Sequence, residues 1–213
     1  MFKWINNITS LCVIGRRGSG KTALVYSVLE KYTKKVYVFK NPQEKEVKSL
    51  GYHILYNISD IERLQECLVW IDEPQLFIKY YDKKTNFALL NMLSIARHRG
   101  ITLVLSTSDT RFVNKSMESY IDVWLIKDIE TELIKRGSIV KKIIRNNCLI
   151  DEEGFRLKVD EFLFYSRDYD NLSGRHNFKK PEYFTETLSK PFKSNCETNC
   201  EPNCETNCEP KCE

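Results

Sequence analysis

The amino-acid sequence predicts an α/β fold in which a mostly parallel β-sheet is flanked by helices. Short apolar runs that predict strands alternate with segments of helical periodicity along most of the chain. Several of these runs are continuously apolar, which is typical of strands covered on both faces. A glycine-rich loop lies between the first predicted strand and the first predicted helix. In such sheets, ligands bind at the carboxyl ends of the strands.

The predicted elements begin with a buried strand at 8–14 and a helix at 23–31. In the helix predicted at 85–99, one face is formed by Leu89, Met92, Leu93 and Ala96. Gly100 is well placed as the C-terminal stop of this helix. The segment 148–192 mixes strand and turn signals with many aromatic residues, and we assign no elements to it. The further apolar runs lie at 36–39, 52–58, 67–71, 101–105 and 123–126, and the further helices at 59–63, 85–99 and 111–120.

The glycine-rich loop fits the phosphate-loop pattern G-x-x-x-x-G-K-[ST]. Glycines allow successive backbone N–H groups to turn inward and bind phosphates at a helix N-terminus. Lys21 would reach the β- and γ-phosphates, and the Thr22 hydroxyl would take one Mg²⁺ position. The alternative is a glycine-rich turn that happens to end in Lys-Thr. The predicted nucleotide-binding residues are Gly15, Arg16, Arg17, Gly18, Ser19, Gly20, Lys21 and Thr22.

Two carboxylates, Asp72 and Glu73, directly follow the apolar run 67–71. A pair of acids that leaves a buried strand is costly unless it has a partner or a chemical role. In phosphate-loop enzymes the first acid orders Mg²⁺, so we assign Asp72 to the metal. We assign Glu73 to the general base that activates water, a role that suits hydrolysis better than transfer to a second substrate. The alternative is that Asp72-Glu73-Pro74 only begins a polar turn.

The segment 96–107, ARHRGITLVLST, resembles the corresponding part of the FtsK/HerA DNA-pumping ATPases. Those proteins have an arginine shortly before a glycine, then a buried strand and a small-Thr-Gln sensor. With the phosphate loop and the two acids in the same order, the resemblance covers roughly residues 8–129. The compact size is most similar to viral genome-packaging ATPases, particularly those of archaeal viruses with internal membranes.

The resemblance implies a RecA-like phosphate-loop NTPase fold and a ring of identical subunits, a hexamer, with ATP and Mg²⁺ bound between subunits. Arg97 then stands where the family has an arginine that reaches a neighbour's γ-phosphate, with Arg99 as the alternative. Both could instead stabilise a helix C-terminus as cations. The family's sensor glutamine is Ser108 here, a shorter side chain, and Thr107 could share its role.

The resemblance also implies a double-stranded DNA partner, contacted without regard to sequence. Two basic segments are candidates for this contact: 77–84, with Lys79, Lys83 and Lys84 among aromatic residues, and 134–145. Either segment could equally be a solvated loop. Neither resembles a motif that reads bases.

The composition divides the chain into an ATPase domain at 1–193 and a tail at 194–213. The tail repeats Asn-Cys-Glu, with cysteines at 196, 200, 204, 208 and 212, and we expect it to be disordered and redox-sensitive rather than a metal site. It holds five Glu and one Lys, which leaves 32 of the 33 basic and 24 of the 29 acidic residues in the domain. The domain therefore carries about +8 against +4 for the whole chain, a charge compatible with a polyanionic partner.

The remaining cysteines, Cys12, Cys67 and Cys148, lie in or beside apolar runs, and we expect them to be buried and reduced. No run of about eighteen apolar residues and no charged-then-apolar leader is present, so we expect a soluble protein without a transmembrane segment.

The function predicted from these observations is ATP hydrolysis coupled to translocation of double-stranded DNA into a viral capsid. The expected location is the host cytoplasm or the virion, with capsid or membrane proteins of the virion as further partners. Two other classes fit the phosphate loop: a nucleoside or nucleotide kinase, and a module that binds nucleotide without hydrolysing it.

Overall fold

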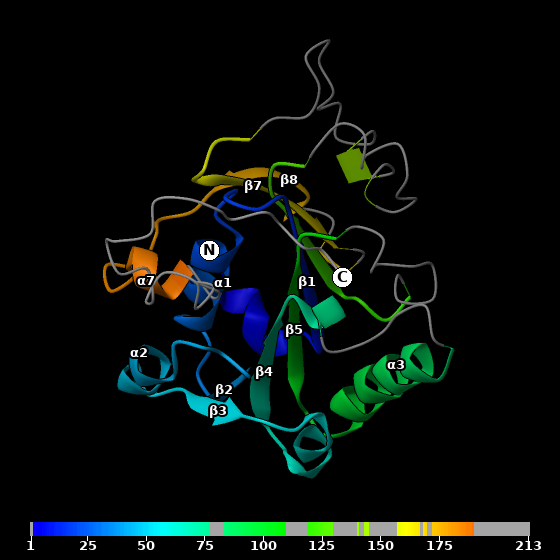
Figure 1. The fold of residues 1–213 in the computed structure, drawn as a ribbon. Coiled ribbons are helices and arrows are strands. Elements are labelled where there is room, and N and C mark those ends of the chain that lie inside the picture. The colour runs from blue at the N-terminus through cyan, green and yellow to red at the C-terminus, as the bar shows by residue number, and fades with distance from the viewer. Residues whose placement is uncertain are drawn as a thin grey trace, which may run out of the picture.

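The fold is built on a single eight-stranded sheet with the strand order β3-β2-β4-β5-β1-β6-β7-β8 (Figure 1). The computed structural model describes residues 2–76, 83–109, 119–129, 140, 143–144, 157–166, 168–169 and 172–189. The strands are β1 (Ser10–Ile14), β2 (Lys35–Phe39), β3 (His53–Leu55), β4 (Cys67–Asp72), β5 (Thr102–Thr107), β6 (Val123–Ile126), β7 (Glu161–Ser166) and β8 (Gly174–Asn177).

Strands β1 to β6 pair in parallel, and β7 and β8 continue the sheet in antiparallel pairing. Strand β1 lies between β5 and β6, and β4 lies on the other side of β5. Strands that follow β1 along the chain therefore lie on both sides of it, and the loop that follows β1 opens beside the ends of β5 and β6. A ligand site of an open parallel sheet is expected at such a point.

Helices cover both faces of the sheet, and each face has its own apolar core (Figure 1). One core contains α1, and the other contains the buried side of α3, where Met92, Leu93 and Ala96 face the sheet. The helices are α1 (Lys21–Leu29), α2 (Glu44–Ser49), α3 (Lys83–His98) and α7 (Glu186–Ser189), with short 3-10 turns η1 (Phe2–Asn7), η2 (Ile58–Arg63) and η3 (Pro74–Leu76).

Helix α1 is buried on almost every side, which explains why its sequence lacks a polar stripe. Of its nine residues only Thr22 is not classed as buried. Tyr26 packs edge-on against Trp70 of β4, with 5.2 Å between ring centroids, and also contacts Phe184 just before α7. The helix that begins at the phosphate loop is therefore fixed by packing along its whole length.

The predicted fold class is confirmed, and the strand at 123–126 has the predicted bounds. The helix expected at 23–31 begins two residues earlier, and Gly100 follows the end of α3 as predicted. Strands β7 and β8 come from the segment that the sequence analysis left unassigned. Cys12 and Cys67 are buried free thiols, as expected. Within the described ranges, no helix has the length and apolar character needed to cross a bilayer.

Several sequence expectations lie outside the described residues. These are most of the expected helix 111–120, the basic segment at 77–82, most of the basic segment 134–145, Cys148 and the tail 194–213.

Candidate active site

The phosphate-loop motif lies at the carboxyl edge of the sheet and is bound to the strands on both sides of β1. The backbone N–H of Gly15 donates to the carbonyl of Thr107 at the end of β5 (3.2 Å), and that of Arg16 donates to the carbonyl of Asp128 after β6 (2.8 Å). The start of the loop is therefore held between the ends of two strands, and α1 begins directly after it.

Gly15 and Gly20 are required by the local geometry of the loop. A Cβ at Gly15 would come within 2.6 Å of the Cβ of Lys127 and 2.7 Å of the Oγ of Ser19, distances that no side chain tolerates. Gly20 has a φ of 89°, in the left-handed region that other residues rarely adopt. The Oγ of Ser19 is buried and has no hydrogen-bond partner among the described residues. An unpaired hydroxyl inside a glycine loop is suited to a phosphate oxygen.

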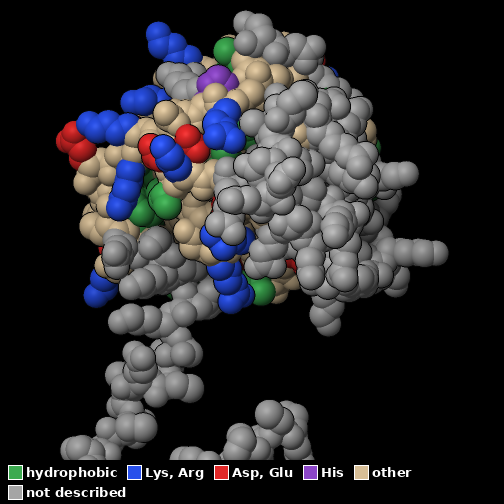
Figure 2. Space-filling view, turned by 90° about the horizontal axis from the view of Figure 1, so that it is seen from above, with side chains coloured by type: hydrophobic (Ala, Val, Ile, Leu, Met, Phe, Trp, Pro, Cys, Tyr) green, Lys and Arg blue, Asp and Glu red, His purple; other side chains and the backbone are tan. Residues whose placement is uncertain are grey.

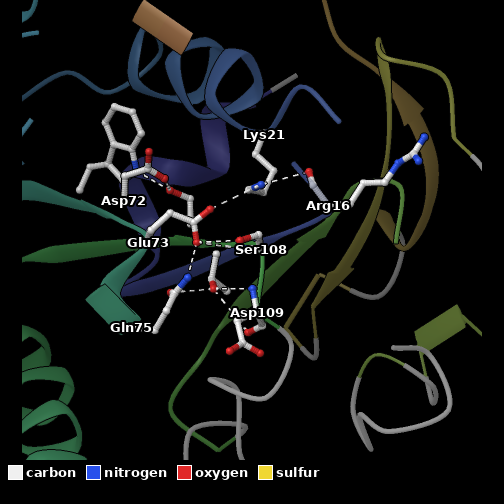
Figure 3. A network of polar contacts seen from close by, with 10 residues as sticks. Arg16, Lys21, Asp72, Glu73, Gln75, Ser108 and Asp109 are labelled. Atoms are coloured by element: carbon white, nitrogen blue, oxygen red, sulfur yellow. Dashed lines mark hydrogen bonds and ion pairs between the residues drawn. The ribbon is translucent and has the colours of Figure 1, made fainter. Parts of the chain in front are cut away.

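Lys21, the first residue of α1, points back across the loop (Figure 3). Its Nζ donates to the carbonyl of Arg16 at 3.1 Å and lies 3.8 Å from Oε1 of Glu73. Only 7% of the residue is exposed, and this burial lowers the pKa of Lys21, while Glu73 and Asp72 oppose the change. A buried ammonium group with so few partners is positioned to bind an anion.

Asp72 is the last residue of β4, and its carboxylate is held by the neighbouring strand. The indole N–H of Trp70 donates to Oγ of Ser106 (2.8 Å), and the Ser106 hydroxyl donates to Oδ1 of Asp72 (2.5 Å). Desolvation raises the pKa of Asp72 to about 6; Glu73 acts in the same direction, whereas Ser106 and Lys21 oppose it. An acid that is costly to ionise here would gain from a bound cation.

Glu73 adopts a left-handed backbone conformation, with φ 45°, and its N–H donates to the carbonyl of Ser106 at 2.7 Å. Such a conformation costs on the order of 1 kcal/mol or more for a non-glycine residue and is common at functional sites. Its Oε2 accepts hydrogen bonds from the N–H and hydroxyl of Ser108, at 2.9 and 3.1 Å, and from the Gln75 amide. Its Oε1 faces Lys21 (Figure 3).

Asp72 could hold a magnesium ion that arrives with a nucleotide, whereas the role predicted for Thr22 stays a prediction. No group of three or more His, Cys, Asp and Glu side chains that could hold a metal occurs among the described residues. Mg²⁺ is typically bound by one or two protein oxygens, with water and substrate phosphates completing its shell. A single carboxylate beside a phosphate loop meets this requirement.

A buried lysine that was not singled out from the sequence lies directly before Asp128, on the β6–β7 side of the loop. Lys127 is 0% exposed, and its Nζ donates to the carbonyls of Lys158, Val159 and Glu161 before and in β7. The ammonium group also lies 4.9 Å from the centroid of the Phe178 ring. Desolvation lowers the pKa of Lys127 to about 8, against the opposing charges of Asp160, Glu161 and Asp128.

The structure brings most of the predicted site residues together but leaves Arg97 and Arg99 at the other end of the sheet. Both are exposed near the end of α3, before β5 begins, whereas the phosphate loop contacts the opposite end of β5. Six strand residues separate these ends, a length of about 20 Å at 3.3 Å per residue. Neither arginine is part of the site of its own chain.

Sequence analysis missed Gln75, Ser106, Lys127 and Asp128. The pair Lys127-Asp128 directly follows a buried strand, as Asp72-Glu73 follows an apolar run. The position of charged residues at the end of a predicted strand would therefore have identified this pair as well. Gln75 lies within the turn that the sequence analysis considered only as an alternative to the catalytic assignment of the acids.

Comparison with solved structures finds similar folds in several ATPases. The chain is similar to B204, the DNA-packaging ATPase from Sulfolobus turreted icosahedral virus, with 21% identity and a TM-score of 0.59 over 81% of this chain and 98% of that one. B204 from Sulfolobus turreted icosahedral virus 2 in complex with AMPPCP gives 18% identity and a TM-score of 0.56, over 82% and 98% of the two chains.

A third similar structure is the cytoplasmic domain of the type VII secretion ATPase EccC from Thermomonospora curvata. It gives 13% identity and a TM-score of 0.54 over 84% of this chain and 24% of that one. No family model and no curated protein matches the sequence. The resemblance predicted from the sequence is thus confirmed at the level of the fold.

Proposed function

We propose that this protein is a Mg²⁺-dependent ATPase that couples hydrolysis to the movement of double-stranded DNA, as in packaging of a viral genome. The observation that carries the hydrolytic part is the arrangement of Lys21 and Glu73 across the phosphate loop. A buried ammonium group lies 3.8 Å from one oxygen of a carboxylate whose other oxygen is fixed by hydrogen bonds. A triphosphate in the loop would lie beside both groups.

In this proposal each residue has one task. Lys21 binds the β- and γ-phosphates and neutralises part of their charge. Oε1 of Glu73 accepts the proton of the attacking water, because Oε2 is already occupied. A magnesium ion bound by Asp72 and Thr22 would supply further charge neutralisation at the phosphates. Ser108 holds Glu73 rather than contacting the phosphate itself.

The DNA part of the proposal is supported by the fold and by charge. Proteins of similar fold include two viral genome-packaging NTPases. Figure 2 shows Lys and Arg side chains spread over the described part of one face, and residues 1–193 carry about +8. Charge of this sign favours a polyanion without specifying a sequence.

The proposal includes a homo-oligomeric ring, most simply a hexamer, in which Arg97 acts on the site of a neighbouring subunit. Its exposure at the far end of β5 leaves it accessible to a neighbour, whereas it is remote from the loop of its own chain. The host cytoplasm or the virion is the proposed location, with capsid or membrane proteins as partners.

ATP hydrolysis by the purified full chain, with and without duplex DNA and across protein concentrations, tests the proposal. We expect turnover per subunit to rise with protein concentration as rings form, to increase with duplex DNA, and to disappear in Lys21→Ala. Activity that is independent of concentration would contradict the shared site. Phosphate transfer to an added nucleoside, without stimulation by DNA, would instead identify a kinase.

A further inference from the structure

The feature that the proposed function does not explain is the side chain of Gln75. It lies in η3, the turn that directly follows Glu73, and the N–H of Leu76 closes this turn on the carbonyl of Glu73 at 2.9 Å. The turn folds the Gln75 side chain back toward the carboxylate, and Figure 3 shows it beside Glu73 and Asp109.

The chemistry of the partners fixes the orientation of the Gln75 amide. A carboxylate oxygen only accepts, so the amide NH₂ must face Oε2 of Glu73. The amide oxygen then faces Thr107, whose hydroxyl donates to it at 2.9 Å. The same hydroxyl accepts the N–H of Asp109 at 3.0 Å. The Thr107 hydroxyl has one hydrogen and a second, longer acceptor in the carbonyl of Asp109 (3.4 Å), and the shorter contact is the one to Gln75.

These bonds connect the ends of two strands through one side chain. The chain runs from the Asp109 backbone through Thr107, the last residue of β5, to Gln75 and then to Glu73 after β4. Thr107 is fully buried, and its carbonyl also accepts the N–H of Gly15 at the start of the phosphate loop. The carboxylate is thus linked through Gln75 to the residue that anchors the loop.

We propose that Gln75 is a positioning residue, which holds Oε2 of Glu73 so that Oε1 stays directed at the nucleotide site. This inference rests on the proposed ATPase function. Gln75 acts through Glu73 and need not touch the nucleotide. Without the amide, the donors that remain on Oε2 among the described residues are the two from Ser108, and the Glu73 backbone is already in an unfavourable conformation.

The test compares Gln75→Met with Gln65→Met. Both changes replace an amide by an apolar chain of similar length, but Gln65 is exposed just before the opposite end of β4. Misplacing a reacting group by about 1 Å can cost about 100-fold, so we expect kcat of Gln75→Met to fall about 10-fold to 100-fold. The affinity for a nonhydrolysable ATP analogue should stay within about twofold of wild type, as should kcat of Gln65→Met.

A double-mutant cycle with Thr107 tests the connection to β5. Thr107→Val removes the hydroxyl at nearly constant volume, and Thr107→Ser restores it. If the two residues act as a unit, the double variant Gln75→Met/Thr107→Val should lose little more kcat than the worse single variant. Thr107→Ser should recover most of what Thr107→Val loses. Thermal unfolding of each variant separates loss of positioning from loss of folding.

Three outcomes would overturn the inference. The first is a kcat of Gln75→Met equal to that of Gln65→Met. The second is an equal loss of kcat and of analogue affinity in Gln75→Met, which would indicate a collapsed loop. The third is simple additivity of the Gln75→Met and Thr107→Val effects in the double-mutant cycle. A wild-type protein without hydrolysis would overturn the proposed function as well. If the wild type hydrolyses ATP, and Glu73→Gln abolishes this hydrolysis while Gln75→Met leaves it intact, this inference alone is overturned.

Discussion

The two walls of the phosphate loop hold their charged groups by different means. On the β4–β5 side, Asp72 and Glu73 are held mainly by side chains, the hydroxyls of Ser106 and Ser108 and the amide of Gln75. On the β6–β7 side, Lys127 is held by three backbone carbonyls and an aromatic ring. The first wall leaves an oxygen facing the loop, whereas the second leaves no polar group of Lys127 exposed.

The two walls therefore separate the groups that face the loop from the groups that support it. Groups held by rotatable side chains can respond to a bound phosphate, whereas a lysine packed on main-chain carbonyls cannot move without disturbing the strands. We therefore expect changes in the first wall to act on turnover and changes in the second to act on stability. Four predictions test this division.

The largest expected effect is on turnover in Glu73→Gln. The substitution keeps the shape of the side chain but removes the proton acceptor, and general-base catalysis contributes on the order of 100-fold to 10,000-fold. Steady-state hydrolysis should fall by that amount, while equilibrium binding of a nonhydrolysable ATP analogue is retained. Retained turnover would contradict the role assigned to the first wall.

The next largest effect is on the stability of Lys127→Met. Methionine keeps much of the apolar stem but leaves three buried carbonyls without their donor, so we expect the free energy of unfolding to fall by about 2–4 kcal/mol. Denaturant unfolding measures this, with Lys48→Met as the control. Lys48 is exposed in an i,i+4 pair with Glu44, so its replacement should cost less than about 0.5 kcal/mol.

The pH dependence of stability should have opposite signs for the two walls. The pKa of Asp72 is raised from 3.8 to about 6, so the folded state keeps a proton that the unfolded state loses. The free energy of unfolding should therefore fall as pH rises from about 4 to 6, by on the order of 1–3 kcal/mol. For Lys127, with its pKa lowered from 10.5 to about 8, the folded state loses its proton first, and the free energy of unfolding should rise above pH 8.

Difference curves isolate each contribution. The unfolding free energy of the wild type minus that of Asp72→Asn should decline across the acid range, and the corresponding difference for Lys127→Met should rise across the alkaline range. A flat curve or a reversed slope in either range would show that the group is not perturbed as its environment indicates.

The smallest effect is expected for the ion pair between Arg16 and Asp128, whose nearest N and O atoms lie 2.7 Å apart. The Arg16 side chain is 55% exposed, so solvent screens the pair, and Arg16→Ala should change the free energy of unfolding by less than about 1 kcal/mol. Chemical denaturation at low and high salt checks this. A loss comparable with that of Lys127→Met would mean that charge pairing, rather than backbone contact, supports the second wall.

Local patterns made the glycine-rich motif and the two acids predictable from the sequence. Gly15, Gly20 and Lys21 lie within one short stretch of the chain, so the motif that they form could be recognised from the sequence directly. Asp72 and Glu73 directly follow a continuous apolar run, so their place at the carboxyl end of a strand followed from the parallel sheet. Arg97 was identified by resemblance alone, and the role proposed for it would require a neighbouring subunit.

The contacts that complete the site were not predictable in the same way. Gln75 reaches Thr107, 32 positions later, only because β4 and β5 are adjacent in the sheet. Lys127 reaches carbonyls more than 30 positions later because β7 pairs antiparallel with β6. The segment that forms β7 gave mixed signals, so its partner could not be inferred.

The class of fold, the glycine-rich motif and the two acids could be predicted from the sequence, because each depends on residues that are neighbours in the chain. Only the folded chain shows which oxygen of Glu73 faces Lys21, what holds Asp72 and where the ammonium group of Lys127 is bound. Hydrogen bonds are short and directional, so these pairings exist only once the strand order has brought distant residues within about 3 Å of each other.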